Sequence, residues 1–568
     1  MSTSHRELLW DRWIRHATEH PDAEAIVHWK AGEPPVRWTW GRLVASAAGV
    51  AEWLTAAGVR PGDVCAIVQR HHPAFHPLYL GVCAAGAIPS VLAYPNARLH
   101  PEKFASGLSG MARHSGLDFV LTEKALAPVI SPLVGGPGSS IRGLLFPVED
   151  GWAPADPAGL RPARAADDPC LLQHSSGTTG LQKAVVLSHR AVLDHVARYA
   201  EAVRLDAAAD RIVSWLPLYH DMGLIATYQM ALAEGVPTVQ LDPFEWVTAP
   251  SLLLEAISAE RGTLTWLPNF AFAFLADRVR DGDLEGVSLG TMRLWVNCSE
   301  PVRADSHARF LRRFAPRGVR PETLAACYAM AETTFAATQT APGRPAKTLA
   351  VDRGALAEGA VEPARAERAA RICVSSGAPI GGCTLRVVDA DRRPLPSGRV
   401  GELAIASESL FDGYRNRPED TARVLSGRWY YSGDLGFEHE GEYYVIGRKK
   451  DLIIVAGNNL YPEDIEDEVG RVPGVLPGRV VAFGVEDAAR GTEQVQVVAE
   501  TELAGGPERR RLEDEIVRAA MRLDVTVARV HLVPPRWLIK SSSGKPSRSA
   551  NRERIVSGAL EQPERGVA

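Results

Sequence analysis

Hydrophobic and polar positions alternate along the chain in blocks that predict helices and strands in turn. Residues 42–57 carry apolar side chains at helical spacing, and residues 63–69 form a short apolar run typical of a buried strand. The apolar stretch 79–92 is interrupted by glycine and proline, which predicts a buried helix and strand rather than a membrane span. Similar alternation returns over 210–335. This pattern favours an α/β fold with layered sheets.

The pattern changes twice in the second half of the chain. Residues 341–370 are rich in Ala, Arg, Glu and Gly and predict an exposed insertion. Residues 372–446 show short alternating segments separated by turns, which predict a β-rich, barrel-like subdomain.

A second domain is expected after the Gly-Arg-Lys-Lys-Asp stretch at 447–451. A buried apolar run at 452–457 and a helix at 462–469 are followed by further strand and helix signals. We therefore expect a large N-terminal domain over residues 1–447 and a small α+β C-terminal domain over residues 448–568.

Composition narrows the class of protein. The chain has 568 residues, 46% hydrophobic and 23% charged, with a net charge of −5, which is typical of a soluble globular protein. This charge gives no basis for binding nucleic acid or for stable membrane insertion. The seven cysteines form no Cys-x-x-Cys pair, and the N-terminus is polar, so we expect a reduced, cytoplasmic protein.

The densest chemical signal is Ser-Ser-Gly-Thr-Thr-Gly at 175–180, followed by Lys183. Backbone N–H groups and hydroxyls donate to phosphate oxygens, glycines permit close approach, and a lysine supplies charge. An ordinary surface turn has the same composition, so the stretch alone leaves both alternatives open. It is not a P-loop, because Lys183 lies three residues after Gly180 and is followed by Ala184.

Two further motifs contain carboxylates. Asp434 ends a Tyr-Ser-Gly-Asp turn and could accept hydrogen bonds from a ribose diol, although an isolated turn aspartate is commoner. Tyr328 could stack on a base, with Glu332 as an oxygen ligand for Mg²⁺. The same pair could also be a packed surface.

Two other signals are weak individually. His220 and Asp221 follow an apolar strand, where loops line active sites in α/β proteins. Lys545 lies in a Gly/Ser loop near the C-terminus and could reach a phosphate, whereas a solvated tail has similar composition.

Taken in order, five motifs resemble those of the adenylate-forming (ANL) superfamily. They lie at 175–183 (phosphate loop), 328–333 (adenine and magnesium), 431–434 (ribose), 447–451 (hinge) and 541–545 (catalytic lysine). Finer features resemble the acyl-CoA synthetase and fatty acyl-AMP ligase branch. These features lie at 215–225, 267–274, 297–302, 314–320 and 351–359.

The resemblance implies two half-reactions. A carboxylate attacks the α-phosphate of ATP to give acyl-AMP, and a thiol of CoA or of a carrier protein then takes the acyl group. The implied ligands are Ser176, Thr178, Thr179 and Lys183 for phosphate, and Glu332 and Thr179 for Mg²⁺. Asp434 and Arg448 are implied for ribose, and Tyr328, Ala329, Met330, Ser299, Glu300 and Pro301 for the adenine site. Lys545 is implied as the catalytic cation, with His220 between the acyl pocket and the thiol tunnel.

The resemblance also implies that the small C-terminal domain is mobile and rotates between the two steps. The hinge would be Lys450, since one residue can absorb a large φ/ψ change. After rotation, the backbone around Gly457 would line the thiol tunnel.

Two departures from the family pattern leave alternatives open. The phosphate loop has Gln182 and Ala184 where Pro and Gly are usual, so the first step could be slow or absent, and an adenylating partner would then supply acyl-AMP. Only residues 415–428 separate Tyr414 from Trp429, so the insertion typical of fatty acyl-AMP ligases is missing. This favours an acyl-CoA ligase over carrier-protein loading. The presence of Lys545, Asp434 and Glu332 together argues against non-catalytic adenylate binding. A hydrophobic acid is expected from the aromatic residues Trp246, Trp266, Phe270, Phe272 and Phe274, although aromatic runs of this kind are more often plain core.

Overall fold

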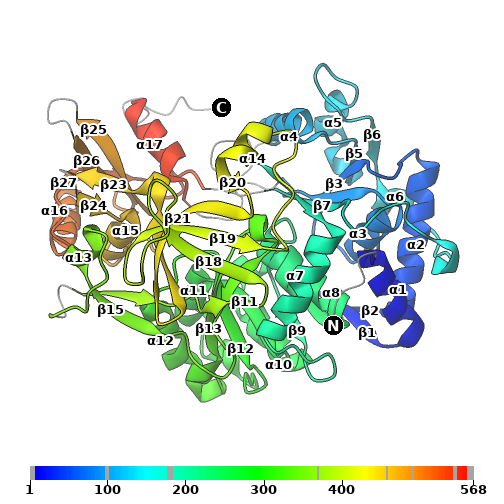
Figure 1. The fold of residues 1–568 in the computed structure, drawn as a ribbon, viewed down its shortest axis with the longest axis horizontal. Helices are drawn as coiled ribbons and strands as arrows, with labels where there is room; N and C mark the ends of the chain where they lie inside the picture. Colours follow the sequence, from blue (N-terminus) through cyan, green and yellow to red (C-terminus); the bar gives the residue numbers. More distant parts are fainter. Residues whose placement is uncertain are drawn as a thin grey trace.

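The computed structural model describes residues 7–95, 101–174, 183–366, 370–455, 458–487, 492–540 and 546–558. Figure 1 shows the N-terminal elements in blue on one side of the molecule and the C-terminal elements in orange and red on the other, with the middle of the chain in green between them. No helix in the described ranges combines the length and apolar character needed to cross a bilayer.

The N-terminal elements alternate as expected from the apolar pattern. They are α1 (Leu9–Glu19), β1 (Glu24–Trp29), β2 (Val36–Thr39), α2 (Trp40–Ala56), β3 (Val64–Val68), α3 (Phe75–Ala84), β4 (Ile88–Val91), α4 (Pro101–Ser115), β5 (Phe119–Thr122), α5 (Ala127–Ile130), β6 (Gly143–Leu145) and α6 (Pro147–Asp150). The order β4-β3-β5-β6 forms a parallel sheet. Thr39 caps α2 by accepting a hydrogen bond from the Arg42 N–H. Helix α3 and strand β4 are buried, which confirms the interpretation of 79–92.

The middle of the chain builds most of a nine-stranded sheet of order β17-β14-β13-β12-β11-β9-β10-β1-β2, to which β17 (Ala378–Pro379) is added from later in the chain. Its region contains β7 (Pro169–His174), β8 (Ala184–Ser188), α7 (His189–Ala202), β9 (Ile212–Ser214), the π-helix η4 (Met222–Gln229), α8 (Met230–Glu234), β10 (Thr238–Leu241), α9 (Pro243–Thr248), α10 (Ser251–Glu260), β11 (Leu264–Pro268), α11 (Asn269–Arg278), β12 (Leu294–Cys298), α12 (Ala304–Phe314), β13 (Leu324–Ala329), the 3₁₀ turn η8 (Ala331–Thr333) and β14 (Ala336–Gln339). Strands β13, β12, β11, β9 and β10 run parallel, so their carboxyl ends share one edge.

The β-rich subdomain follows the large sheet and is confirmed. It comprises β15 (Thr348–Asp352), α13 (Arg353–Ala357), β16 (Ala370–Val374), β17 (Ala378–Pro379), β18 (Cys383–Val388), β19 (Gly401–Ser407), α14 (Pro418–Val424), β20 (Leu425–Ser426), β21 (Trp429–His439) and β22 (Glu442–Arg448). Strands β18 to β22 form an antiparallel sheet around β19 and β21. The prediction of an exposed insertion at 341–370 is wrong in part. Strand β15 pairs with β16, and Val351 and Leu356 are buried against this sheet, because their apolar side chains find partners distant in sequence.

The last elements have a hydrophobic core of their own. They are η10 (Lys449–Asp451), β23 (Ile453–Val455), β24 (Asn458–Leu460), α15 (Pro462–Gly470), β25 (Val480–Asp487), β26 (Thr492–Glu500), α16 (Pro507–Met521), β27 (Val527–Val533) and α17 (Arg548–Val556). The prediction of a buried run at 452–457 is wrong for Ile454, which is 49% exposed. Side chains alternate between the two faces of the β23–β24 hairpin, so Ile453 is buried while Ile454 faces solvent.

Candidate functional site

The loops at the carboxyl edge of the large sheet carry most of the site residues expected from the sequence. Ligand sites in α/β folds form at this edge because loops from neighbouring parallel strands converge there. His220 follows β9, Ser299, Glu300 and Pro301 follow β12, and Ala329, Met330 and Glu332 lie at or after the end of β13. Sheet topology thus gathers segments that are more than one hundred residues apart in the chain.

Tyr328 and Asp434 join the large sheet to the β-rich subdomain. The Tyr328 hydroxyl donates a hydrogen bond of 2.7 Å to Oδ2 of Asp434, and Arg448 Nε lies 3.0 Å from Oδ1. Asp434 and Arg448 face each other in the β21–β22 register. Burial, and then the Asp434 charge, raise the pKa of Tyr328 well above its usual value, so its hydroxyl remains a donor. The carboxylate is therefore held in place, and each oxygen can accept a further hydrogen bond.

The loop after β12 is tied to the start of α11. The Phe270 N–H donates to Oε2 of Glu300 at 2.9 Å, which places a carboxylate at the positive end of that helix. Ser299 adopts φ 67°, a left-handed conformation uncommon for a serine. The Glu300 side chain is thus engaged by α11, while the backbone of the loop remains at the edge of the sheet.

His220 lies in the turn between β9 and the π-helix η4. The backbone N–H of His220 donates to the Pro217 carbonyl at 3.1 Å, and the centre of the His220 ring lies 4.8 Å from that of Tyr219. A Cβ on Gly223 would approach the Pro217 oxygen to 2.4 Å, so only glycine allows this turn to fold so tightly. π-Helical turns are often found at functional sites.

Glu332 has a partner that the sequence did not indicate. The Tyr414 hydroxyl donates to Oε1 of Glu332 at 2.7 Å. The Nζ of Lys183 lies 4.6 Å from the centre of the Tyr414 ring and 3.6 Å from Oδ1 of Asp420. In the sequence, Tyr414 served only to mark the start of the short segment before Trp429, and nothing in its local pattern predicted these contacts.

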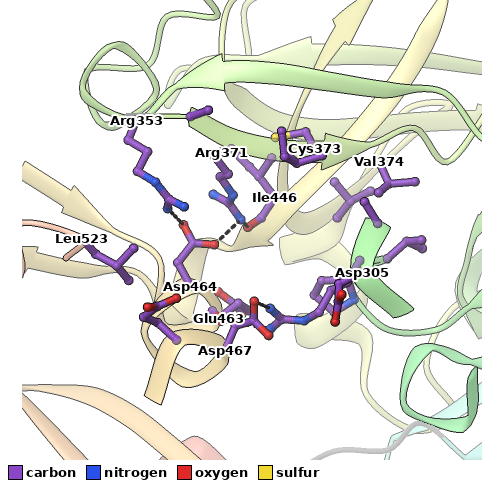
Figure 2. A pocket seen from close by; sticks show the side chains of 18 of the residues that line it. Asp305, Arg353, Arg371, Cys373, Val374, Ile446, Glu463, Asp464, Asp467 and Leu523 are labelled. Carbon is purple, nitrogen blue, oxygen red and sulfur yellow. Dashed lines mark hydrogen bonds and ion pairs between the residues drawn. The ribbon is translucent and has the colours of Figure 1, made fainter. Parts of the chain in front are cut away.

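A cavity of about 320 Å³ separates the large part of the chain from α15. Figure 2 shows Arg353 and Arg371 pointing toward Asp464 from the opposite wall. Nη2 of Arg371 lies 3.2 Å from Oδ1 of Asp464, and Nη1 of Arg353 lies 3.7 Å from Oδ2. Pro301 also lines this cavity. No local sequence pattern predicts this cluster, because its arginines and carboxylates come from segments far apart in the chain.

Lys450 lies in the turn η10, between the last strand of the β-rich subdomain and hairpin β23–β24, and is exposed. Arg548 of α17 pairs with Asp451 at the end of this turn at 2.9 Å, and with Glu463 and Glu466 of α15, both at 2.7 Å. These pairs fasten the C-terminal helix beside the proposed hinge.

Five of the expected residues lie outside the described residues. They are Ser176, Thr178 and Thr179 of the phosphate loop, Gly457 and Lys545. Within the described ranges, no group of three or more His, Cys, Asp and Glu side chains is arranged as a metal site.

The aromatic residues near the loop after β9 divide into two groups. Trp266 and Phe272 are fully buried, and the Trp266 indole donates to the Tyr199 hydroxyl at 2.8 Å, so both belong to the core. Trp246 stacks on Trp215 with ring centres 3.6 Å apart, and Phe270 beside them is 42% exposed. Trp215 and Trp246 are themselves buried, so the accessible apolar surface of this group comes from Phe270 and from the half-buried Phe274.

Comparisons with known proteins show the family to which the chain belongs. The model of the AMP-binding enzyme family matches residues 13–415. The chain is 32% identical to the long-chain-fatty-acid–AMP ligase FadD26 of Mycobacterium marinum, over 91% of each chain. It is 30% identical to the 4-hydroxyphenylalkanoate adenylyltransferase of Mycobacterium tuberculosis, over 91% of this chain and 86% of that protein.

Solved structures give the same result. One from a study of fatty acyl-adenylate ligases of E. coli and L. pneumophila superposes with a TM-score of 0.89 and 25% identity, over 99% of this chain and 100% of that chain. The fatty acyl-adenylate ligase of L. pneumophila in complex with acyl adenylate and pyrophosphate gives a TM-score of 0.72 and 27% identity, over 98% and 96% of the two chains. The chain therefore belongs to the AMP-binding enzyme family of the adenylate-forming (ANL) superfamily, within the group of fatty acyl-AMP ligases and acyl-CoA ligases.

Proposed function

We propose that this protein activates a hydrophobic carboxylic acid with ATP and then transfers the acyl group to the thiol of CoA. In the first step a carboxylate oxygen bonds to the α-phosphorus of ATP, and the bond to pyrophosphate breaks. In the second step the thiol sulfur bonds to the acyl carbon, its proton is lost, and AMP leaves. The observation that carries the proposal lies beside the carboxyl edge of the sheet, where Asp434 accepts a hydrogen bond from Tyr328 and pairs with Arg448.

Nucleotide binding is assigned to this edge. Asp434 accepts the ribose hydroxyls beside Arg448, and Tyr328 lies against the adenine, with the backbone of Ser299, Glu300 and Pro301 opposite and Ala329 and Met330 below. Ser176, Thr178, Thr179 and Lys183 bind the phosphates, and Lys545 stabilises the charge that develops on the α-phosphate.

The residues present fit a magnesium ion that arrives with the nucleotide. Mg²⁺ commonly uses one or two carboxylates together with substrate phosphates, and Glu332 offers a carboxylate already oriented by Tyr414. Glu332, with Thr179, would hold the ion, which when bound neutralises phosphate charge.

The acid is proposed to be apolar. Near the turn that carries His220, the exposed Phe270 packs edge-on against the buried stack of Trp215 and Trp246. The half-buried Phe274 lies 5.5 Å from Trp246 between ring centres. Such a surface suits an alkyl or aryl chain better than a charged group. Long-chain-fatty-acid–AMP ligase and 4-hydroxyphenylalkanoate adenylyltransferase are the names of two relatives.

CoA is proposed as the acceptor because the chain between Tyr414 and Trp429 contains only α14 and β20. A carrier protein is the second candidate, and the similarity to proteins named as AMP ligases favours it. In either case, residues 448–568 are proposed to rotate about Lys450, with the backbone at Gly457 then lining the thiol path. Seven free cysteines support the proposal of a cytoplasmic location.

A product assay tests both steps separately. The enzyme receives a panel of hydrophobic acids with ATP–Mg²⁺ in one arm and premade acyl-adenylates in the other, each with CoA or a phosphopantetheinylated carrier protein. Acyl-CoA in both arms supports the proposal, and acyl-carrier protein alone supports the second candidate. Thioester only from premade adenylate would show that an adenylating partner performs the first step, and no product in any arm would refute the proposal.

A further inference from the structure

We infer that Tyr414 is a positioning residue that joins the phosphate-binding Lys183 to the metal-binding Glu332 and sets their relative placement for the first half-reaction. This inference rests on the proposed function and concerns the same nucleotide site. It adds a residue to which neither the motifs nor the comparisons assign a role.

The Tyr414 side chain contacts both charged groups at once. Its hydroxyl donates to Oε1 of Glu332 at 2.7 Å, and its ring faces the Lys183 ammonium at 4.6 Å from the ring centre. The first contact is a charge-assisted hydrogen bond and the second a cation–π contact. One buried aromatic side chain thus separates a cation and an anion and orients both.

The backbone around Tyr414 is fixed on the same two sides. The Phe411 N–H donates to the Glu332 carbonyl at 2.9 Å. The Arg415 N–H donates to the Ala184 carbonyl at 2.9 Å, and Tyr414 forms a β-bridge with Val185 in β8, the strand that follows Lys183. The segment 411–415 therefore links the chain after the phosphate loop to the 3₁₀ turn that carries Glu332.

Helix α14 completes the arrangement. Thr421 Oγ1 accepts a hydrogen bond of 2.9 Å from the Tyr414 N–H, and Asp420 lies 3.6 Å from the Lys183 ammonium. Gly413 adopts φ 123°, and a Cβ there would lie 3.0 Å from Thr421 Cγ2, so glycine lets α14 pack closely. Asp420 also pairs with Arg417 and Arg423, both at 3.1 Å. These two arginines neutralise the Asp420 carboxylate without Lys183, so the carboxylate can hold the Lys183 ammonium over the Tyr414 ring.

Two contacts on one side chain predict separable effects. Tyr414→Phe removes only the hydroxyl, so Glu332 loses its donor while Lys183 keeps the ring. Tyr414→Leu removes both. The first variant should weaken binding that depends on Mg²⁺, and the second should also weaken phosphate binding without metal.

The test measures binding of α,β-methylene-ATP by calorimetry, with Mg²⁺ and with EDTA. We expect Tyr414→Phe to raise Kd about tenfold with Mg²⁺ and less than twofold with EDTA, as befits the loss of a hydrogen bond to a charged group. Tyr414→Leu should raise Kd about tenfold or more with Mg²⁺ and about threefold or more with EDTA. Thioester formation from premade acyl-adenylate should stay within twofold of wild type for Tyr414→Phe.

Tyr443→Phe is the matched control, because it removes a buried hydroxyl that donates to the Leu385 carbonyl at 2.8 Å in the same subdomain. If Tyr414→Phe binds the Mg²⁺ complex like wild type, or shows no larger change than Tyr443→Phe, the inference is overturned. Wild-type enzyme that binds the analogue but forms no adenylate from any acid would refute the proposed function instead, and the binding comparison would still decide the role of Tyr414.

Discussion

Arg303 and Asp467 form an ion pair of 2.6 Å between the loop before α12 and helix α15. The same guanidinium donates to the Glu463 carbonyl at 3.0 Å. Together with the pairs from Arg353 and Arg371 to Asp464, these contacts hold the C-terminal elements against the large part of the chain. This charged seam lies beside an apolar contact, in which Tyr461 clusters with Val351, Phe437 and Tyr444.

Breaking this seam should change the balance between the two half-reactions. Partly exposed ion pairs contribute ~0.2–1 kcal/mol each, which is enough to shift a two-state population a few-fold. We expect Arg303→Ala and Asp467→Ala to alter the ratio of adenylation to thioester rates two- to fivefold, with little change in Tm. In the double variant the two effects should be non-additive, and strictly additive effects would show that this pair does not couple the two parts.

The proposed hinge predicts a selective defect. Lys450→Pro restricts φ at the one residue expected to rotate, so pyrophosphate exchange should persist while thioester formation falls at least a hundredfold. Lys450→Ala serves as the control and should retain both steps. Equal loss of both steps in the proline variant would refute the hinge assignment.

The Tyr328–Asp434 hydrogen bond predicts a nucleotide-binding defect. Tyr328→Phe leaves a buried carboxylate oxygen without its donor, and Asp434→Asn also removes the charge opposite Arg448. We expect KM for ATP to rise about tenfold in each variant, with KM for the acid changed less than twofold. Steady-state kinetics with each substrate varied would check this, and a selective rise in KM for the acid would contradict the ribose assignment.

Buried histidines predict loss of stability in mild acid. His28 stacks on His71 with ring centres 3.8 Å apart, and its Nδ1 lies 3.3 Å from Nε2 of His76. Burial, and then the neighbouring histidines, lower the pKa of His76 to about 3, so it is neutral in the folded protein. The unfolded chain takes up this proton near pH 6.5, and stability is therefore complete above that pH and declines as the pH falls below it.

Each histidine that stays neutral in the folded protein should lower the free energy of unfolding by up to ~1.4 kcal/mol per pH unit as the pH falls from 6 to 4. Urea unfolding across this range should show a steep acid limb. His76→Gln, which cannot take up a proton, should reduce the slope by about one proton relative to wild type. An unchanged slope would show that His76 is protonated in the folded state.

Local patterns account for much of the fold. The helical spacing at 42–57 and the Pro-initiated run at 462–469 became α2 and α15 because their periodicity and helix-start signals are properties of neighbouring residues. The alternation over 210–335 became the parallel strands of the large sheet. The prediction failed at 341–370 because burial of Val351 depends on a β-rich sheet formed later in the chain.

The sequence by itself determined the family, the order of the motifs and the residue types available for nucleotide chemistry, because these are carried by short segments. Only the tertiary structure decided which of those residues meet. Tyr328 reaches Asp434 across 106 positions, and Tyr414 reaches Glu332 across 82. Such contacts depend on strand order and on the packing of α14 against the sheet. The physical reason is that packing between elements, rather than local sequence, sets how side chains from different strands meet at the edge of a sheet.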